Sequence, residues 1–119
     1  MADNRRQFQR IEFDAPVMMQ QAGKILSTDV IDISLKGLLL KGEDFPFDLS
    51  KTVHIIIPLS DDVSIEMHAL CSYSRDGVSG FRWEQLDLES LTHLRRLLEL
   101  NSEDATLLER ELAHLSESQ

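Results

Sequence analysis

The stretch that decides the fold is residues 63–83, VSIEMHALCSYSRDGVSGFRW. Apolar side chains occupy every second position from Val63 to Tyr73, which is the pattern of a β-strand with one buried face. The dipeptide Asp76-Gly77 follows, and two-residue hairpin turns favour it because both of their central positions adopt a positive φ. The stretch therefore predicts a β-hairpin whose second strand contains residues 80–83.

The same period of two recurs upstream of this hairpin. Further strands are predicted at residues 11–20, 25–33, 38–40 and 53–57. The phase of residues 25–33 slips near Asp29, which indicates a bulge or burial on both faces. Turn-forming residues separate the strands, for example Gly23 and the segment 42–50. Six short strands joined by turns predict a mainly β fold, either an antiparallel barrel or a sandwich.

The hydrophobic period becomes helical after residue 86. Asp87 can cap a first helix, and Asn101 or Ser102 can cap a second one. The leucines that share a face are Leu88, Leu91, Leu94 and Leu98 in the first helix, and Leu108, Leu112 and Leu115 in the second. The first helix is expected to dock on the strands. The second one either docks or leaves its leucines for another chain.

Length and composition narrow the setting. A chain of 119 residues is one domain by size. Its net charge of −9 repels DNA and anionic membranes. The sequence has no apolar stretch long enough to span a membrane and no secretory signal at its start, so we expect a cytoplasmic protein. We also expect a monomer. The single cysteine, Cys71, excludes an internal disulfide framework and is expected to be a small buried hydrophobe.

Two short motifs carry the chemistry. The stretch RRQFQR, residues 5–10, gathers three arginines in an acidic chain, although charged runs near a terminus are commonly solvated tails. The stretch DISLKG, residues 32–37, places Asp32 and Ser34 on the same side of the second strand as it ends. Each motif alone is weak, because turns commonly use Asp, Ser and Gly. Together, R-x-x-x-R followed by D-x-S-x-x-G is much more specific.

This arrangement resembles the PilZ domain, the bacterial receptor module for the second messenger cyclic di-GMP. The resemblance covers nearly the whole chain and is greatest to stand-alone, single-domain members. It implies a six-stranded antiparallel PilZ-type β-barrel at residues 11–85, a flexible arginine loop at residues 1–10 and C-terminal α-helices at residues 87–119. It also implies a receptor in second-messenger signalling rather than an enzyme, with cyclic di-GMP as ligand, no cofactor and no metal.

The resemblance assigns roles to five residues. Arg6 and Arg10 would bind the phosphates or the O6/N7 edges of the guanines, because a guanidinium matches both in a bidentate manner. The Asp32 carboxylate would accept from guanine N1–H and N2–H₂, and Ser34 would donate to a phosphate or base. Gly37 would let the backbone approach the ligand or adopt a positive φ. The arginine loop is expected to close over the ligand and to order as it binds.

Arg5 and Tyr73 are candidates for further ligand contacts. In this family an arginine at the position of Arg5 fits a mode in which two stacked ligands share one site, so we expect two ligands per chain. Tyr73 lies at the end of its strand, where its ring could stack on a guanine. The alternative is that Tyr73 is simply the last core residue of its alternating run, and the sequence leaves the two interpretations open.

Other functions find less support in the sequence. The four histidines are scattered without further ligands at metal-site spacing, and no catalytic motif is present. The competing hypothesis is a degenerate PilZ-like adaptor that binds a protein through its acidic C-terminal helices without nucleotide. Such an adaptor is expected to lack the motif arginines, whereas Arg6 and Arg10 are present. The downstream protein partner of a receptor is not identified by the sequence.

Overall fold

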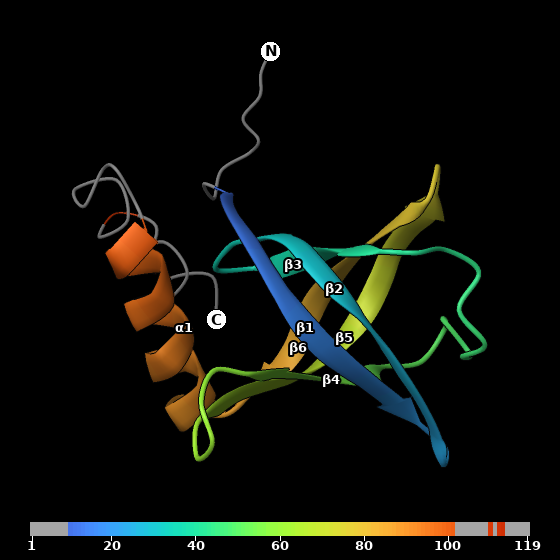
Figure 1. Cartoon of the computed structure of the whole chain (residues 1–119), viewed down its shortest axis with the longest axis horizontal. Helices are drawn as coiled ribbons and strands as arrows, with labels where there is room; N and C mark the ends of the chain where they lie inside the picture. Colours follow the sequence, from blue (N-terminus) through green and yellow to red (C-terminus); the bar gives the residue numbers. More distant parts are fainter. Residues whose placement is uncertain (1–9, 102–109, 111, 114–119) are drawn as a thin grey trace.

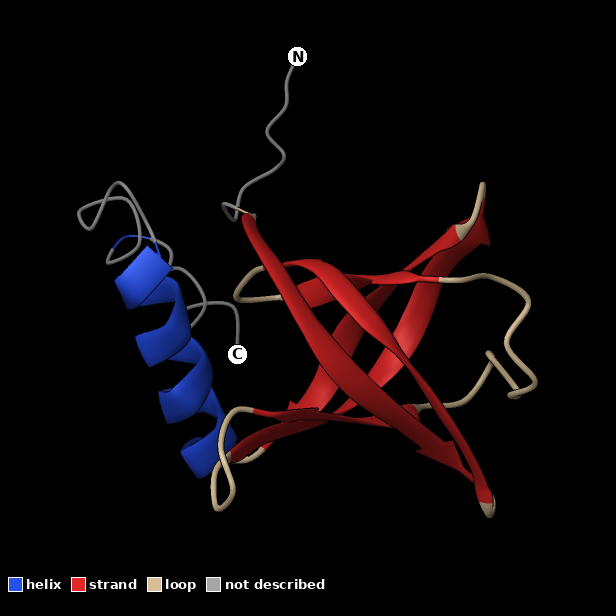
Figure 2. Cartoon of the chain, in the orientation of Figure 1, coloured by secondary structure: helices blue, strands red, loops and turns tan. Residues whose placement is uncertain are grey.

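The computed structural model describes residues 10–101, 110, 112 and 113. These residues form six strands and one helix (Figures 1 and 2). The elements are β1 (Ile11–Gln21), β2 (Lys24–Ile33), β3 (Gly37–Lys41), β4 (Val53–Pro58), β5 (Ser64–Arg75), β6 (Val78–Leu86) and α1 (Leu88–Asn101). The predicted mainly β fold is confirmed.

The strands close into a barrel in the order β1-β2-β3-β6-β5-β4, and every neighbouring pair is antiparallel. β3 therefore pairs with β6, although a long stretch of chain separates them. The barrel closes where β1 pairs with β4, and the residues of β1 in this pairing are Met18, Met19 and Gln20. The remaining residues at the start of β1 pair with β2 alone, and the register shifts there between Glu12 and Ala15.

Both predicted tight turns are present. Ala22 and Gly23 join β1 to β2 with φ of 50° and 84°, and Asp76 and Gly77 join β5 to β6 with φ of 58° and 80°. Two consecutive positive φ values are the signature of the turn that matches the twist of a β-hairpin. Glycine at the second position removes the steric cost of that conformation.

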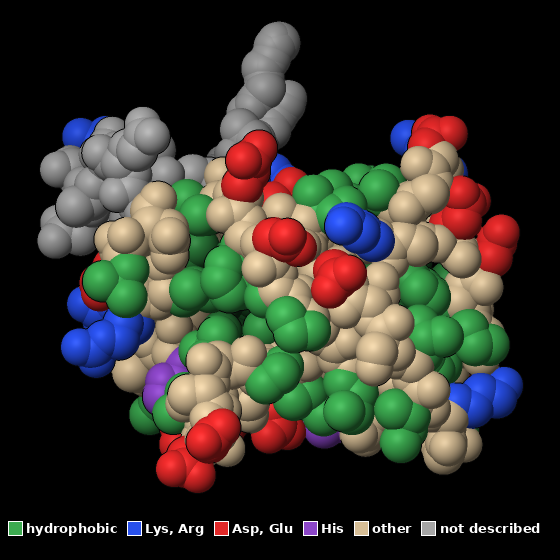
Figure 3. Space-filling view, viewed as in Figure 1, with side chains coloured by type: hydrophobic (Ala, Val, Ile, Leu, Met, Phe, Trp, Pro, Cys, Tyr) green, Lys and Arg blue, Asp and Glu red, His purple; other side chains and the backbone are tan. Residues whose placement is uncertain are grey.

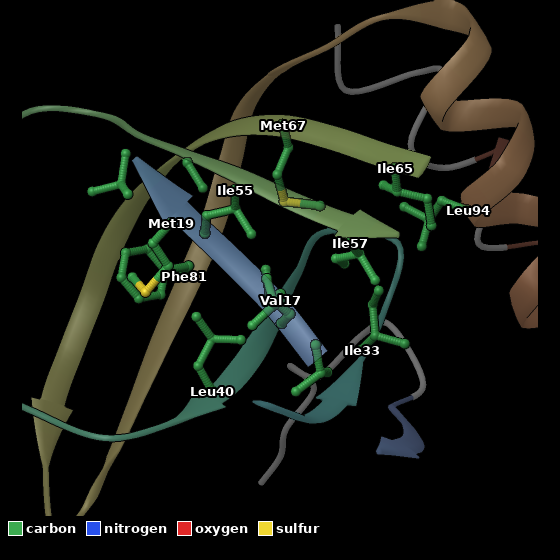
Figure 4. Close-up of a cluster of buried hydrophobic side chains, with 14 of the residues drawn as sticks. Val17, Met19, Ile33, Leu40, Ile55, Ile57, Ile65, Met67, Phe81 and Leu94 are labelled. Atoms are coloured by element: carbon green, nitrogen blue, oxygen red, sulfur yellow. The ribbon is translucent and has the colours of Figure 1, made fainter. Parts of the chain in front are cut away.

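Apolar side chains at the inward-facing positions of the strands fill the barrel interior (Figure 4). In β1 the alternation leaves Val17 and Met19 almost fully buried and Met18, between them, exposed. The register shift in β2, between Val30 and Asp32, turns both Val30 and Ile33 inward. This shift is the predicted bulge, displaced by one or two residues from Asp29.

Helix α1 packs against β5 through one stripe of side chains. Leu94 and Leu98 are buried, and Leu94 lies beside Ile65 of β5 (Figure 4). Ser90 is buried in the same stripe, and its hydroxyl accepts a hydrogen bond of 3.0 Å from the backbone N–H of Glu66. Since positions 90, 94 and 98 form the buried stripe, Leu88 points away from it and is 78% exposed. The expectation that Leu88 shares the buried face is wrong.

Asp87 caps α1 as predicted. Its Oδ1 accepts from the backbone N–H of Ser90 at 3.0 Å, and its carbonyl accepts from Leu91 N–H. The hydrogen bonds from Ser90 lower the pKa of the Asp87 carboxyl group. Most of the second predicted helix lies outside the described residues, although Leu112 packs against the core. No helix in the described part of the chain is long and apolar enough to cross a membrane.

Candidate functional site

The two motifs meet where β1 begins and β2 ends. The antiparallel register pairs Glu12 with Asp32, so Arg10, which directly precedes β1, comes to lie beside the end of β2. Arg10 Nη2 lies 2.8 Å from Asp32 Oδ1, and Arg10 Nε donates to the same oxygen at 3.0 Å. Within the described residues, no hydrogen bond engages Asp32 Oδ2. The Arg10 side chain is 55% exposed and that of Asp32 is 17% exposed.

The turn between β2 and β3 uses the hydroxyl group of Ser34. Ser34 N–H donates to the carbonyl of Gly37 at 2.8 Å, and Ser34 Oγ accepts from Lys36 N–H at 3.2 Å. Ser34 is 7% exposed. The side chain of Leu35 is completely buried, and the Trp83 indole N–H donates to the Leu35 carbonyl at 2.7 Å. These contacts fix the turn against the barrel, and the predicted ligand contact of Ser34 stays a prediction.

Gly37 lies where β3 passes close to β6. A Cβ at this position would lie 2.0 Å from the carbonyl oxygen of Phe81 and 3.1 Å from Cα of Arg82. Gly37 does not adopt a positive φ, so that part of its predicted role is wrong. The close approach of two strands is the reason for glycine here.

A row of residues crosses four strands from Asp32 to Tyr73. Asp32 pairs with Leu39 of β3, Leu39 with Gly80 of β6, and Gly80 with Tyr73 of β5. Gly80 alternates with the inward-facing Phe81, so the row lies on the outer face of the barrel. An acidic side chain thus stands at one end of this row and an aromatic ring at the other.

Tyr73 is 41% exposed, so the interpretation as a last core residue is wrong. The register of β5 shifts between Cys71 and Tyr73, which turns Tyr73 outward after the regular alternation. Its ring lies over Gly80, where a Cβ would be 2.7 Å from Tyr73 Cε1, and the Arg75 guanidinium is 5.7 Å from the ring centre. Cys71 is only half-buried, and burial raises the pKa of its thiol.

The sequence predicted Arg10, Asp32, Ser34, Gly37 and Tyr73 as binding residues, which stays a prediction, and it did not indicate Gly80. A glycine inside a strand often marks a place where another group approaches closely, and this signal could have identified it. Arg5 and Arg6 lie outside the described residues, so their roles stay predictions. Among the residues that the structure describes, no group of three or more His, Cys, Asp and Glu side chains is placed to bind a metal ion.

A family model matches most of the chain, and several solved structures share its fold. The family model of the PilZ domain matches residues 4–100. Among solved structures, the chain is similar to the inhibitor of motility MotI/DgrA of Bacillus subtilis, with 19% identity and a TM-score of 0.64 over 86% of this chain. The match covers 55% of MotI, so the chain spans about half the length of that protein.

Two further structures share the fold. The PilZ domain of CeSA from a cellulose-synthesizing bacterium is 24% identical, with a TM-score of 0.58 over 75% of this chain and 93% of that domain. The PilZ domain of YcgR from Escherichia coli, solved with c-di-GMP, is 17% identical, with a TM-score of 0.61 over 98% of this chain and 100% of that one.

Proposed function

The chain belongs to the PilZ domain family, a family of cyclic di-GMP receptors, and from this premise we propose that it binds cyclic di-GMP between Arg6, Arg10 and the strand end at residues 32–37. The ligand carries two phosphates and two guanines. Guanidinium groups match the phosphates and the O6/N7 edge of guanine, and a carboxylate matches the N1–H and N2–H₂ edge.

The observation that carries the proposal is the ion pair between Arg10 and Asp32. It joins two motifs that are 22 residues apart in the sequence. Both Arg10 contacts go to Oδ1 of Asp32, which leaves Oδ2 able to accept from a guanine. The Arg10 side chain is 55% exposed, and the N–H groups that do not contact Asp32 remain available as donors for a phosphate. The pair is therefore suited to bind both parts of one nucleotide.

The outer row supports the proposal that two stacked ligands bind. Three inter-strand spacings separate Asp32 from Tyr73, which corresponds to about 14 Å. This length has room for more than one purine. Tyr73 would stack on a guanine at the far end, and Arg5 would add cationic contacts for the additional phosphates.

Ligand binding is expected to change the charge of the protein surface around the site. The ligand would bring negative charge to the region of Arg10 and Asp32, and a partner protein would recognise the altered surface. The ligand is bound and released intact, as expected for a receptor rather than an enzyme. Because Arg10 is present and paired with Asp32, a nucleotide-free adaptor is the less favoured function.

Calorimetric titration with cyclic di-GMP tests the site. Arg10→Ala and Asp32→Ala should each reduce the binding free energy by on the order of 2–4 kcal/mol, because each leaves a charged partner without its counterpart. Arg95→Ala is the matched control, since Arg95 lies on α1 and pairs with Glu99. We expect two ligands per chain for the wild type and one for Arg5→Ala. Wild-type affinity in Arg10→Ala or Asp32→Ala would refute the site.

A further inference from the structure

Two cationic side chains flank Gly37, and neither is a residue type that the two motifs specify, since Lys36 occupies a variable position of D-x-S-x-x-G. Arg82 stands directly opposite Gly37 in the ladder between β3 and β6. It is exposed and alternates with the buried Phe81, so it projects from the outer face of the barrel. Lys36 immediately precedes Gly37, and its Nζ lies 5.5 Å from the centre of the Trp83 ring. Within the described part of the chain, neither cation forms an ion pair.

This pair of like charges lies on an otherwise acidic protein. The chain has 21 Asp and Glu against 12 Lys and Arg, and Figure 3 shows carboxylates spread over the barrel surface. Burial and, secondarily, the charge of Arg82 lower the pKa of Lys36. Two neighbouring cations repel each other, and a bound anion relieves that repulsion.

The position of Arg82 brings it into the ligand region. β3 is the single strand between β2, which carries Asp32, and β6, which carries Arg82. Two inter-strand spacings therefore separate the two strands, or about 10 Å. Gly37 lies between the Ser34 turn and Arg82 and has no side chain, so β3 places no side chain between the Arg82 guanidinium and a ligand at the Ser34 end of the site, whereas Leu39 is the β3 residue beside Asp32.

We propose that Arg82, with Lys36 beside it, forms a phosphate subsite on the barrel wall next to Gly37, and that this subsite binds a phosphate group of cyclic di-GMP. The proposal rests on the proposed function. Arg82 supplies the planar fork that matches two phosphate oxygens, and Lys36 supplies a second charge held over the Trp83 ring. The barrel itself thus contributes cations in addition to those of the arginine motif.

Titration of four variants with cyclic di-GMP tests this subsite. Arg82→Ala should weaken binding about 10- to 100-fold, the range for losing a charge-assisted hydrogen bond. Arg82→Lys keeps the charge but loses the fork, so a smaller loss is expected. Lys36→Ala should also weaken binding. Arg95→Ala makes the same change of net charge as Arg82→Ala at a distance from the site and should leave the affinity within about twofold of wild type.

A second readout reports on the phosphate itself. The ³¹P resonances of bound cyclic di-GMP should differ between wild type and Arg82→Lys. This variant is expected to fold, because position 82 is exposed and lysine keeps the positive charge. If the wild type binds while Arg82→Ala matches Arg95→Ala and the ³¹P spectrum is unchanged in Arg82→Lys, the subsite is refuted and the proposed function stands. If the wild type does not bind at all, the proposed function is refuted and this inference with it.

Discussion

Replacement of Gly37 by alanine should destabilise the protein before any ligand is added. The new Cβ would lie 2.0 Å from the Phe81 carbonyl oxygen and 3.0 Å from the Phe81 carbonyl carbon. Both atoms belong to the backbone of β6, so no side-chain rotation can relieve the contact. β3 must move away from β6, which disturbs the ladder in which Gly37 pairs with Arg82.

The expected cost follows from this geometry. Overpacking that shifts backbone typically costs about 1–3 kcal/mol. For a domain of this size each kcal/mol lowers the melting temperature by roughly 3–5 °C, so a fall of roughly 3–15 °C is expected. Thermal unfolding of ligand-free protein, followed by circular dichroism, measures it directly.

Gly23 provides the matched control. It has a φ of 84°, and nothing lies within 4 Å of its hypothetical Cβ, so its requirement for glycine is conformational rather than steric. Asparagine tolerates positive φ better than alanine does. At position 23, therefore, asparagine should be less harmful than alanine. At position 37 asparagine should be at least as harmful as alanine, because the larger side chain meets the same backbone.

Two results would overturn this reasoning: a wild-type melting temperature for Gly37→Ala, or a Gly37→Asn variant more stable than Gly37→Ala. The prediction also affects how binding data are interpreted. A shift of β3 moves the strand beside Asp32, so Gly37→Ala should weaken ligand binding even if the ligand never touches Gly37. Loss of binding in this variant therefore does not by itself locate the ligand.

Two further predictions concern the stacking ring and the helix cap. Gly80→Ala should push the Tyr73 ring aside and reduce the ligand-binding free energy by as much as Tyr73→Ala does, roughly 1–3 kcal/mol. The double variant should show no further loss. Calorimetry and the NMR signals of the single tyrosine check this prediction, and additive losses would contradict it. Asp87→Ala should destabilise α1 at neutral pH, because Ser90 N–H loses its acceptor. The folded-state pKa of Asp87 is lowered, so its charge stabilises the fold above its ordinary pKa of 3.8, and this contribution disappears as pH falls through the lowered value. The difference in melting temperature between wild type and Asp87→Ala should therefore shrink in acid. The difference between wild type and Asp87→Asn should be smaller at neutral pH, because the amide oxygen still accepts from Ser90 N–H, and it should shrink in acid in the same way. A pH-independent difference for both variants would contradict the assignment.

Local patterns predicted the elements of the barrel well. The alternation in residues 11–20 depends only on which face of β1 is buried, and the Asp76-Gly77 turn depends only on the φ values that it requires. The cap at Asp87 is also a local contact, with Ser90. Structural features that depend only on residues close together in the chain can therefore be predicted from the sequence.

Features set by pairing with a distant strand were not predicted. Tyr73 continues the alternation of β5, but the register shift that turns it outward arises in the pairing with β6. Gly80 and Arg82 reach the candidate site only because β6 is the neighbour of β3. Alternation in a strand does not identify its partner, so the sequence offered Tyr73 only as one of two interpretations and did not indicate Gly80 or Arg82.

The pairing of β1 indicates how binding could alter the surface without disturbing the barrel. β1 joins β4 only through residues 18–20, whereas its first residues pair with β2 alone and include a register shift. The ion pair between Arg10 and Asp32 is the side-chain contact at this weakly paired start. Under the proposed function, a ligand that engages both residues acts on the part of β1 with the fewest strand contacts, where local rearrangement costs least. The buried faces of β3, β5 and β6 need not change, so the signal to a partner is expected to be a local change of shape and charge around Arg10 rather than a rearrangement of the core.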